Sequence, residues 1–187
     1  MLIVIKEKNN VYMAVSAWGT SDCISLEDAL HEDNLPMWRV EGAPKCLMAV
    51  TGTSSLGYDL LRYKDFGLRA ALTPTNLITK IVPAMKNTLG EFEQLDKDGD
   101  NWGGLIIAKG GKAYYLTCRF TYEEIEESLA IGRDATVARG ALRLTRGMPA
   151  MERIREVLRI METTFKYKQF PVVVMSTADG ERKILHE

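Results

Sequence analysis

The sequence predicts an α+β fold in which antiparallel sheets are covered by helices. Strand-like apolar runs occur in hairpins joined by short polar or glycine turns, and helical patterns arrive in pairs. A parallel sheet would instead require strands and helices to alternate along the chain. The length of 187 residues suits one domain with a sizeable core. We therefore expect residues 1–187 to form a single domain.

Composition excludes several classes of partner. The net charge is −1, and basic and acidic residues are interspersed, so neither nucleic acid nor an anionic membrane is indicated as a partner. No apolar run reaches the roughly 20 residues that span a bilayer, and the first ten residues carry their charges after the apolar part, the reverse of a secretory signal. Cys23, Cys46 and Cys118 are odd in number and widely spaced, as is typical of reduced cytosolic thiols. These features predict a cytoplasmic protein.

No cofactor or metal site is expected. Two histidines are too few for a zinc-ligand pattern. The acidic run at residues 96–100 is similar to a calcium loop, but Gly99 stands one place too early and Ile107 replaces the bidentate glutamate. A solvated loop is the better interpretation of this run.

The first element expected is a β-hairpin. Apolar runs at residues 2–5 and 11–15 flank a polar turn, in which Asn9 and Asn10 suit left-handed backbone angles. Further along the chain, short apolar runs at residues 37–40 and 45–50 predict two more strands.

Helices are expected next. One begins within residues 56–63, and a clearer one opens at residues 74–76. The buried stripe expected on the clearer helix comprises Leu77, Ile78, Ile81, Val82, Met85 and Leu89. Pro83 should bend this helix, because proline removes one internal hydrogen bond.

A second hairpin and a pair of helices follow. Strands at residues 103–108 and 112–117 flank a Lys109-Gly110-Gly111 turn, and a later apolar strand ends at Ile131-Gly132. Asp134 is predicted to cap a helix that ends at Gly147 and packs on a sheet through Ala138, Gly140, Ala141, Leu142 and Leu144.

The second helix of this pair opens at Pro149. Its apolar face comprises Ile154, Val157, Leu158, Met161 and Phe165, and its polar face Glu152, Arg153, Arg155, Glu156 and Arg159. Two last strands are expected, at residues 171–175 and, after an Asp179-Gly180 turn, at residues 182–185.

These landmarks resemble those of a known family. The I-G-x5-A-x-x-A-L turn and helix at residues 131–142, with the amphipathic helix and apolar strand behind it, is similar to the C-terminal half of proteasome β-type subunits. The peptidase subunit of the bacterial two-component ATP-dependent protease is the nearer pattern. The resemblance runs from Leu2 to about Thr177. It implies the four-layer αββα sandwich of the N-terminal-nucleophile hydrolases and assembly into homo-oligomeric rings.

The catalytic pattern of that family departs from this sequence at its first position. The family uses a threonine, serine or cysteine at the mature N-terminus, just before the first strand, and the residue's own amine acts as the base. Met1 and Leu2 stand at that place here, and neither side chain is a nucleophile. Leucine is also too bulky a second residue for routine removal of an initiator methionine.

Other positions of the family's site differ as well. Ser16 stands in place of its aspartate, Arg39 is the cation nearest to the place of its lysine, and Arg133 replaces its serine after the Ile-Gly turn. An arginine does not titrate in the range that a catalytic lysine uses. Gly52 alone retains the family residue, where a backbone N–H would face an oxyanion. The resemblance therefore implies a retained fold with a degenerate site, whose candidate residues are Ser16, Arg39, Gly52 and Arg133.

Two functions remain open from the sequence. The first is a non-catalytic, proteasome-like assembly or binding protein that forms a homo-oligomer, to which Met148 and Met151 are expected to contribute. The second is an amidohydrolase with a relocated nucleophile, for which Ser16, or Cys46 and Thr51 near Gly52, are candidates. No feature of the sequence identifies an ATPase partner.

Overall fold

The computed structural model describes residues 1–16, 30–31, 35–51, 62, 67–91, 104–117, 119–166 and 168–186. Several predicted features lie outside these residues: Gly52, most of the helix expected at 56–63, the acidic run at 96–100, Cys23 and Cys118. The side chain of Leu89 is likewise outside them.

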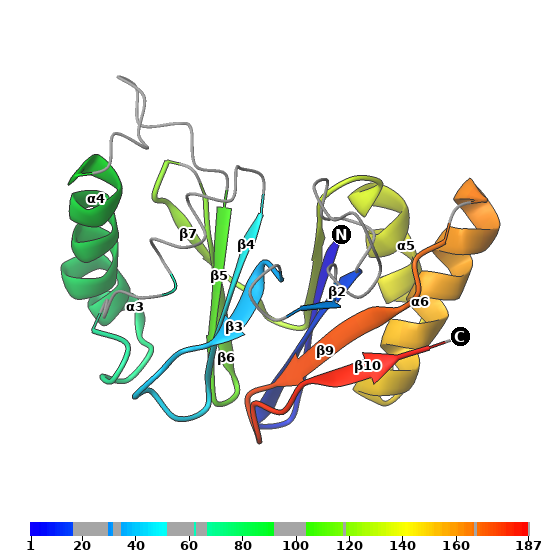
Figure 1. Cartoon of the computed structure of the whole chain (residues 1–187), viewed down its shortest axis with the longest axis horizontal. Helices are drawn as coiled ribbons and strands as arrows, with labels where there is room; N and C mark the ends of the chain where they lie inside the picture. Colours follow the sequence, from blue (N-terminus) through cyan, green and yellow to red (C-terminus); the bar gives the residue numbers. More distant parts are fainter. Residues whose placement is uncertain are drawn as a thin grey trace.

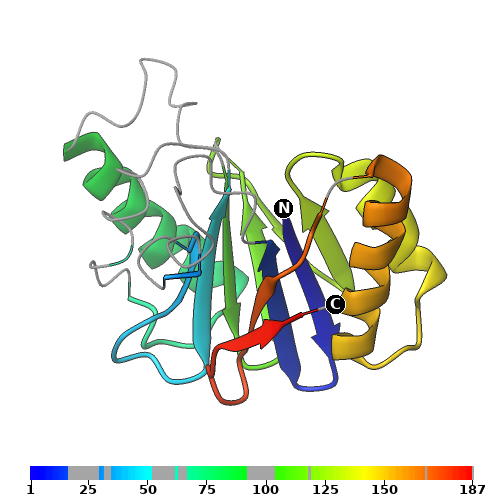
Figure 2. The same cartoon turned by 45° about the vertical axis from the view of Figure 1, so that its right-hand side comes forward.

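Two five-stranded sheets face each other, and helices cover the outer face of each (Figures 1 and 2). The first sheet has the order β10 (Lys183–Leu185), β9 (Val172–Ser176), β2 (Asn10–Ser16), β1 (Leu2–Glu7) and β8 (Ser128–Ile131). The second has the order β3 (Met37–Arg39), β4 (Cys46–Thr51), β5 (Gly104–Lys109), β6 (Lys112–Leu116) and β7 (Tyr122–Glu124). All the strand pairs in these sheets are antiparallel. The predicted four-layer αββα sandwich is thereby confirmed.

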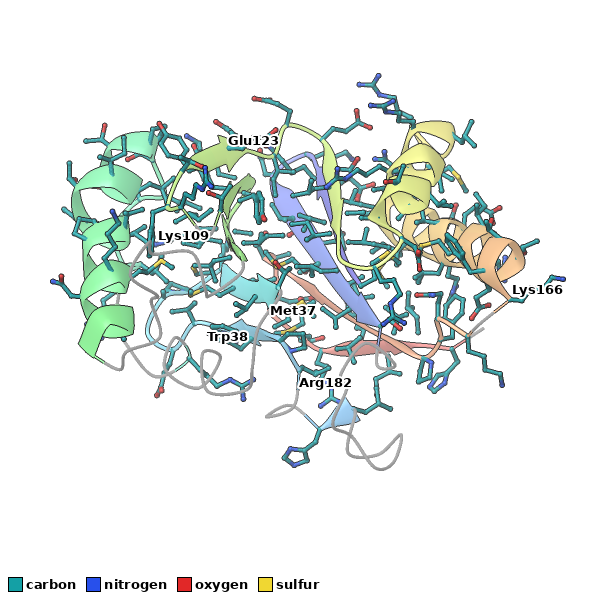
Figure 3. The ribbon with its side chains drawn as sticks, turned by 90° about the horizontal axis from the view of Figure 1, so that it is seen from above. Met37, Trp38, Lys109, Glu123, Lys166 and Arg182 are labelled. Atoms are coloured by element: carbon teal, nitrogen blue, oxygen red, sulfur yellow. The ribbon has the colours of Figure 1, made fainter. Side chains whose placement is uncertain are left out.

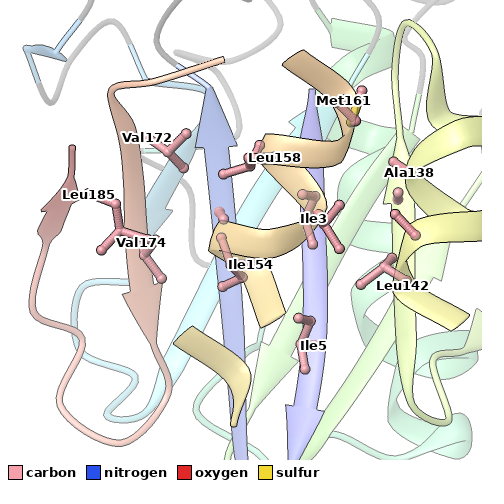
Figure 4. Close-up of a cluster of buried hydrophobic side chains, with 14 of the residues drawn as sticks. Ile3, Ile5, Ala138, Leu142, Ile154, Leu158, Met161, Val172, Val174 and Leu185 are labelled. Carbon is pink, nitrogen blue, oxygen red and sulfur yellow. The ribbon is translucent and has the colours of Figure 1, made fainter. Parts of the chain in front are cut away.

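Strand β1 shows why the layers form. Successive side chains of a strand point to opposite faces of its sheet. Leu2 and Val4 therefore enter the core between the two sheets, whereas Ile3 and Ile5 enter the core beneath the helices. Figure 4 shows Ile3 and Ile5 beside residues of both covering helices. A strand that is apolar on both faces is suited to the middle of such a stack.

The first hairpin is tighter than the sequence predicts. Glu7 pairs with Asn10, so only Lys8 and Asn9 remain for the turn. The residue with left-handed angles is Lys8, at φ 55°. The prediction that Asn9 and Asn10 take up these angles is wrong, because strand pairing extends to Asn10.

Helices α5 (Ala135–Leu144) and α6 (Ala150–Phe165) cover the first sheet. The buried residues of α6 include Ile154, Val157, Leu158 and Met161, as predicted, and Phe165 is half-buried. In α5 the predicted contacts of Ala138, Ala141 and Leu142 are confirmed, but Leu144 is 83% exposed and Gly140 is also exposed. Leu144 lies two residues beyond Leu142, so it falls on another face of the helix.

Two details at the ends of these helices differ from expectation. Asp134 precedes α5 with left-handed angles, and its side chain makes no capping hydrogen bond. Its backbone carbonyl instead accepts from the N–H groups of Val137 and Ala138. Pro149 stands at the N-cap of α6, one residue before the position that suits proline best.

A helical segment of three parts covers the second sheet: α3 (Pro74–Asn76), a π-helical turn η3 (Leu77–Ile81) and α4 (Val82–Glu91). The wide turn ends two residues before Pro83, whose missing N–H donor disturbs the regular ladder. Leu77, Ile81 and Met85 are buried as predicted, but Ile78 is 56% exposed. Ile78 follows Leu77 by one residue and so lies about 100° around the helix from it.

No strand was predicted where β7 forms. Its three residues pair with β6 at the edge of the second sheet, and Tyr122 and Glu123 are exposed. Among the helices that the structure describes, none has the length and apolar character needed to cross a membrane.

Candidate functional site

The start of β1 and the ends of β2 and β8 lie together around Met1. Met1 precedes β1, Ser16 ends β2 and Gly132 follows β8, and β1 pairs with both of the other strands. The backbone N–H of Ser16 donates to the Met1 carbonyl at 3.2 Å. The resemblance places the family's nucleophile here, so these strand ends define the candidate site.

The side chains at the start of β1 belong to the core. Leu2 is buried in the cluster between the sheets, and Met1 packs against the cluster beneath α5 and α6. Neither a thioether nor an isobutyl group can add to a carbonyl carbon as a nucleophile. The start of β1 is therefore occupied by apolar packing.

Ser16 is 4% exposed, and its hydroxyl is committed to a structural bond. Its Oγ donates to the backbone carbonyl of Gln169 at 2.8 Å. An amide carbonyl cannot accept a proton at neutral pH, so this contact does not activate the serine. The backbone N–H of Gln169 in turn donates to Glu162 Oε1 at 2.5 Å. Ser16 thus ties the end of β2 to the segment between α6 and β9.

Arg133 shares the space around Met1. Gly132 has φ 111°, and a Cβ added to it would lie 3.3 Å from Met1 Cα. Burial, and after it the positive charge of the exposed Arg133, lowers the pKa of the Met1 ammonium group below its ordinary value. Of the predicted site residues, the structure brings Ser16 and Arg133 together beside Met1.

Arg39 lies elsewhere. A Cβ added to Gly180 would lie only 2.9 Å from Arg39 Cδ, so this arginine packs on the turn between β9 and β10. That turn follows Ser176, which pairs with Tyr12, four residues from Ser16 along β2. Arg39 is therefore at the opposite end of the sheets from Met1. Gly52 lies outside the described residues.

The other candidate nucleophiles are held in strand β4. Cys46 is fully buried, and this burial raises the pKa of its thiol to about 12, although Lys109 acts in the opposite direction. Thr51 Oγ1 lies 3.3 Å from the carbonyl of Gly104, to which it donates. A protonated, buried thiol is inert towards electrophiles.

This burial gives a testable prediction for Cys46. In native protein, iodoacetamide should leave Cys46 unmodified, and the rate should not rise between about pH 7 and pH 9, because the thiol stays protonated well above that range. Peptide mapping by mass spectrometry measures this, and urea-unfolded protein, in which Cys46 should react fully, is the control. Native alkylation of Cys46 at the rate of a free thiol would contradict the prediction.

A cluster that the sequence did not predict joins α5 and α6 to the loop before β8. Arg153 Nη2 donates to Glu127 Oε1 at 2.9 Å and to the Leu142 carbonyl at 2.5 Å, and Arg146 lies 2.6 Å from Glu127 Oε2. Arg153 is 4% exposed, although helix periodicity predicts it on the polar face of α6. No local pattern reveals this cluster, because its partners lie far apart in sequence.

A hollow of about 520 Å³ adjoins this cluster. We call it the β7–α5 hollow, and its lining residues are Tyr115, Glu123, Glu124, Ile125, Glu126, Glu127, Ser128, Leu129, Arg143, Arg146 and Arg153. Glu127 lies next to the backbone of Lys6, whose N–H donates to the Glu127 carbonyl. The hollow is therefore at the end of β1 opposite to Met1. In the part of the chain that the structure describes, no three metal-ligand side chains are grouped.

Solved structures share this architecture. BPH from Thiobacillus denitrificans, solved in complex with epoxomicin, is 18% identical with a TM-score of 0.67, and the match covers 94% of this chain and 96% of BPH. HslV from Trypanosoma brucei is 13% identical with a TM-score of 0.61, covering 94% of this chain and 97% of HslV. This chain has the proteasome-like N-terminal-nucleophile hydrolase fold.

The ancestral β-subunit Anbu from Yersinia bercovieri is similar over 100% of this chain and 86% of its own, at 9% identity and a TM-score of 0.66. No protein-family model and no curated protein matches the sequence. Likeness at these identities establishes the fold alone, so the chemistry has to be argued from the site residues.

Proposed function

We propose that residues 1–187 form one proteasome-like subunit with a degenerate catalytic site, which acts by assembly or binding and not by catalysis. The observation that carries this proposal is the apolar packing of Met1 and Leu2 where the family's nucleophile would stand. Threonine-type catalysis requires a hydroxyl or thiol at that place, close to an amine base.

The neighbouring residues support the same proposal. The Ser16 hydroxyl is bonded to a backbone carbonyl, and Arg133 adds a fixed positive charge where the family has a serine. Arg39, the cation expected to stand in for the family's lysine, packs on the distant β9–β10 turn. The alternative, an amidohydrolase with a relocated nucleophile, is disfavoured because Cys46 is buried and protonated.

The proposal predicts no turnover of fluorogenic peptides and no covalent adduct with epoxomicin. Intact-mass spectrometry should show the unmodified chain, while BPH from Thiobacillus denitrificans, whose solved structure contains epoxomicin, is the positive control. Reproducible turnover that epoxomicin abolishes would refute the proposal. Turnover that resists epoxomicin but is lost in Ser16→Ala or Cys46→Ser would favour the relocated nucleophile instead.

The proposed subunit is a cytoplasmic homo-oligomer. Cys46 is a free, buried cysteine, in keeping with a reducing compartment. Of the two methionines expected to face a partner, Met148 is 38% exposed, whereas Met151 is half-buried against the core beneath the helices. Met148 and the exposed Leu144 therefore support a contact between subunits, and Met151 does not.

A further inference from the structure

The lining of the β7–α5 hollow includes charged side chains that are not used inside the protein. Glu123 and Glu126 belong to β7 and the loop after it, Arg143 belongs to α5, and all of them are exposed. None of these side chains makes a hydrogen bond or an ion pair with a described residue. Viewed from above, Glu123 on β7 lies on the same side of the molecule as α5 (Figure 3). The hollow therefore offers two unpaired carboxylates and one unpaired guanidinium.

A buried guanidinium in the same lining has donors to spare. Arg153 is 4% exposed, and all of its hydrogen bonds leave from Nη2. Its Nε is buried without a partner, and its Nη1 makes no hydrogen bond with a described residue. The Ser128 hydroxyl accepts from Arg153 and finds no acceptor of its own among the described residues. Buried polar groups are usually satisfied, so spare donors beside a hollow indicate a place for an acceptor.

The size and the apolar part of the hollow suit a small organic molecule. Its volume of about 520 Å³ lies within the range that is typical of small-molecule sites. Tyr115, Ile125 and Leu129 add apolar atoms to the lining. Sites of this kind bury the apolar part of a ligand and use a few polar groups to orient it.

We propose that the β7–α5 hollow binds a small zwitterion with one carboxylate and two cationic groups, namely a free basic amino acid or a dipeptide that contains one. The carboxylate lies on the arginine side, where Arg153 Nη1 and the Ser128 hydroxyl donate to it and Arg143 adds positive charge. The cationic groups lie against Glu123 and Glu126, and the aliphatic stem covers the apolar lining. This inference goes beyond the proposed function and depends on neither the homo-oligomer nor the degenerate site.

The charge balance of the lining disfavours simpler ligands. Glu127 already pairs with Arg146 and Arg153, and Glu124 pairs with Lys6, so these charges are largely neutralised within the protein. A small dianion would be repelled by the two unpaired carboxylates. A diamine would leave the spare arginine and serine donors without an acceptor. A ligand of both signs, with its positive charge in excess, matches the groups that remain.

The first test titrates the full chain with L-lysine, L-arginine and glycyl-lysine by isothermal titration calorimetry, with ligand-observed NMR as a second readout. We expect a dissociation constant of roughly a millimolar or lower, as is typical of ligands of this size. Cadaverine is lysine without its carboxylate, and norleucine lacks the side-chain ammonium group. Each of these matched ligands should bind at least about tenfold more weakly than lysine, because one charged contact is lost. Comparison of lysine with glycyl-lysine distinguishes a free amino acid from a peptide.

The second test changes the unpaired charges of the hollow. Arg143→Ala, and separately Glu123→Gln with Glu126→Gln, should each raise the dissociation constant by about tenfold, because each removes the charge opposite one end of the ligand. Arg155→Ala and Glu181→Gln are the matched controls, since both residues are exposed and lie outside the lining. They should leave binding unchanged. All these positions are exposed, so circular dichroism should show unaltered folding.

The outcomes separate this inference from the proposed function. Binding of a basic amino acid or its dipeptide that the hollow variants weaken and the control variants do not supports the inference. Absence of binding by all three ligands in both readouts overturns it. It is also overturned if cadaverine or norleucine binds as tightly as lysine, or if the hollow variants bind like the wild type. The epoxomicin experiment decides the catalytic question whichever of these results is found.

Discussion

Replacing Arg153 with leucine is expected to lower the free energy of unfolding by about 3 kcal/mol, from the known cost of breaking a buried ion pair. Arg153 is nearly inaccessible, and its guanidinium joins the Glu127 carboxylate, the Ser128 hydroxyl and the Leu142 carbonyl. Leucine would leave that carbonyl with only the long 3.5 Å contact from Thr145 Oγ1, and Glu127 with Arg146 alone. Glu127 is 36% exposed, so water compensates part of the loss and the value stays at the lower end of the range.

Urea unfolding followed by circular dichroism measures this loss. The matched control is Arg159→Leu on the same helix, because Arg159 is exposed and lies 4.0 Å from Glu156. A surface pair of this kind is worth at most about 1 kcal/mol, so the control should change stability little. Equal losses in the two variants would show that the burial of Arg153 adds nothing to the stability of the fold. The comparison also tests the cluster that supports the β7–α5 hollow.

The fold was predictable because the central strands of both sheets are apolar and are joined in two hairpins by short turns. The β1–β2 hairpin and the β5–β6 hairpin follow from local pattern alone, and these pairings fix the middle of each sheet. Strand β7 was missed because Tyr122, Glu123 and Glu124 show no apolar alternation. It forms because β6 offers an unpaired edge, which is a property of the assembled sheet and not of the segment.

Helix periodicity identified the buried faces but misplaced several residues. Ile78 and Leu144 were expected to be buried and are exposed, because each lies one or two residues outside the stripe that packs on the sheet. Arg153 was expected to be exposed and is buried, because an acidic partner from a distant loop compensates its charge. Periodicity describes one helix, whereas the width of the face that packs on the sheet and the partners of a buried charge depend on the neighbouring elements.

The candidate site was predictable only in part. The pairing of β1 with β2 and β8 places Ser16 and Arg133 beside Met1, as the resemblance implies. Arg39 was assigned to the site only by its position along the chain. It lies against Gly180 instead, because β3 is a short edge strand that ends at the side of the two sheets far from Met1. Sequence spacing could not reveal this, since the direction of a side chain at a strand end depends on its packing.

The β1–β2 turn and the β5–β6 turn meet at the end of the sheets opposite to Met1. Gly111 is the residue that allows the two turns to approach each other. A Cβ added to Gly111 would lie 2.9 Å from Asn9 Cα and 3.1 Å from Asn9 C, both backbone atoms. The Thr177 hydroxyl lies 2.6 Å from the Gly110 carbonyl and 2.7 Å from Asn10 Oδ1, so it joins both turns to the end of β9. This contact fixes the two sheets relative to each other.

Gly111→Ala is therefore expected to lower the free energy of unfolding by about 2 kcal/mol, as for other overpacked sites, because one hairpin must move away from the other. Gly110→Ala is the matched control: its φ of 58° is unfavourable for alanine, but nothing lies within 4 Å of the added Cβ. Its loss should be about 1 kcal/mol, the cost of left-handed angles. Urea unfolding of both variants measures the difference. If Gly110→Ala lowers the free energy of unfolding more than Gly111→Ala, the close approach of the two turns does not stabilise the packed sheets. Backbone conformation alone would then explain why glycine is needed at both positions.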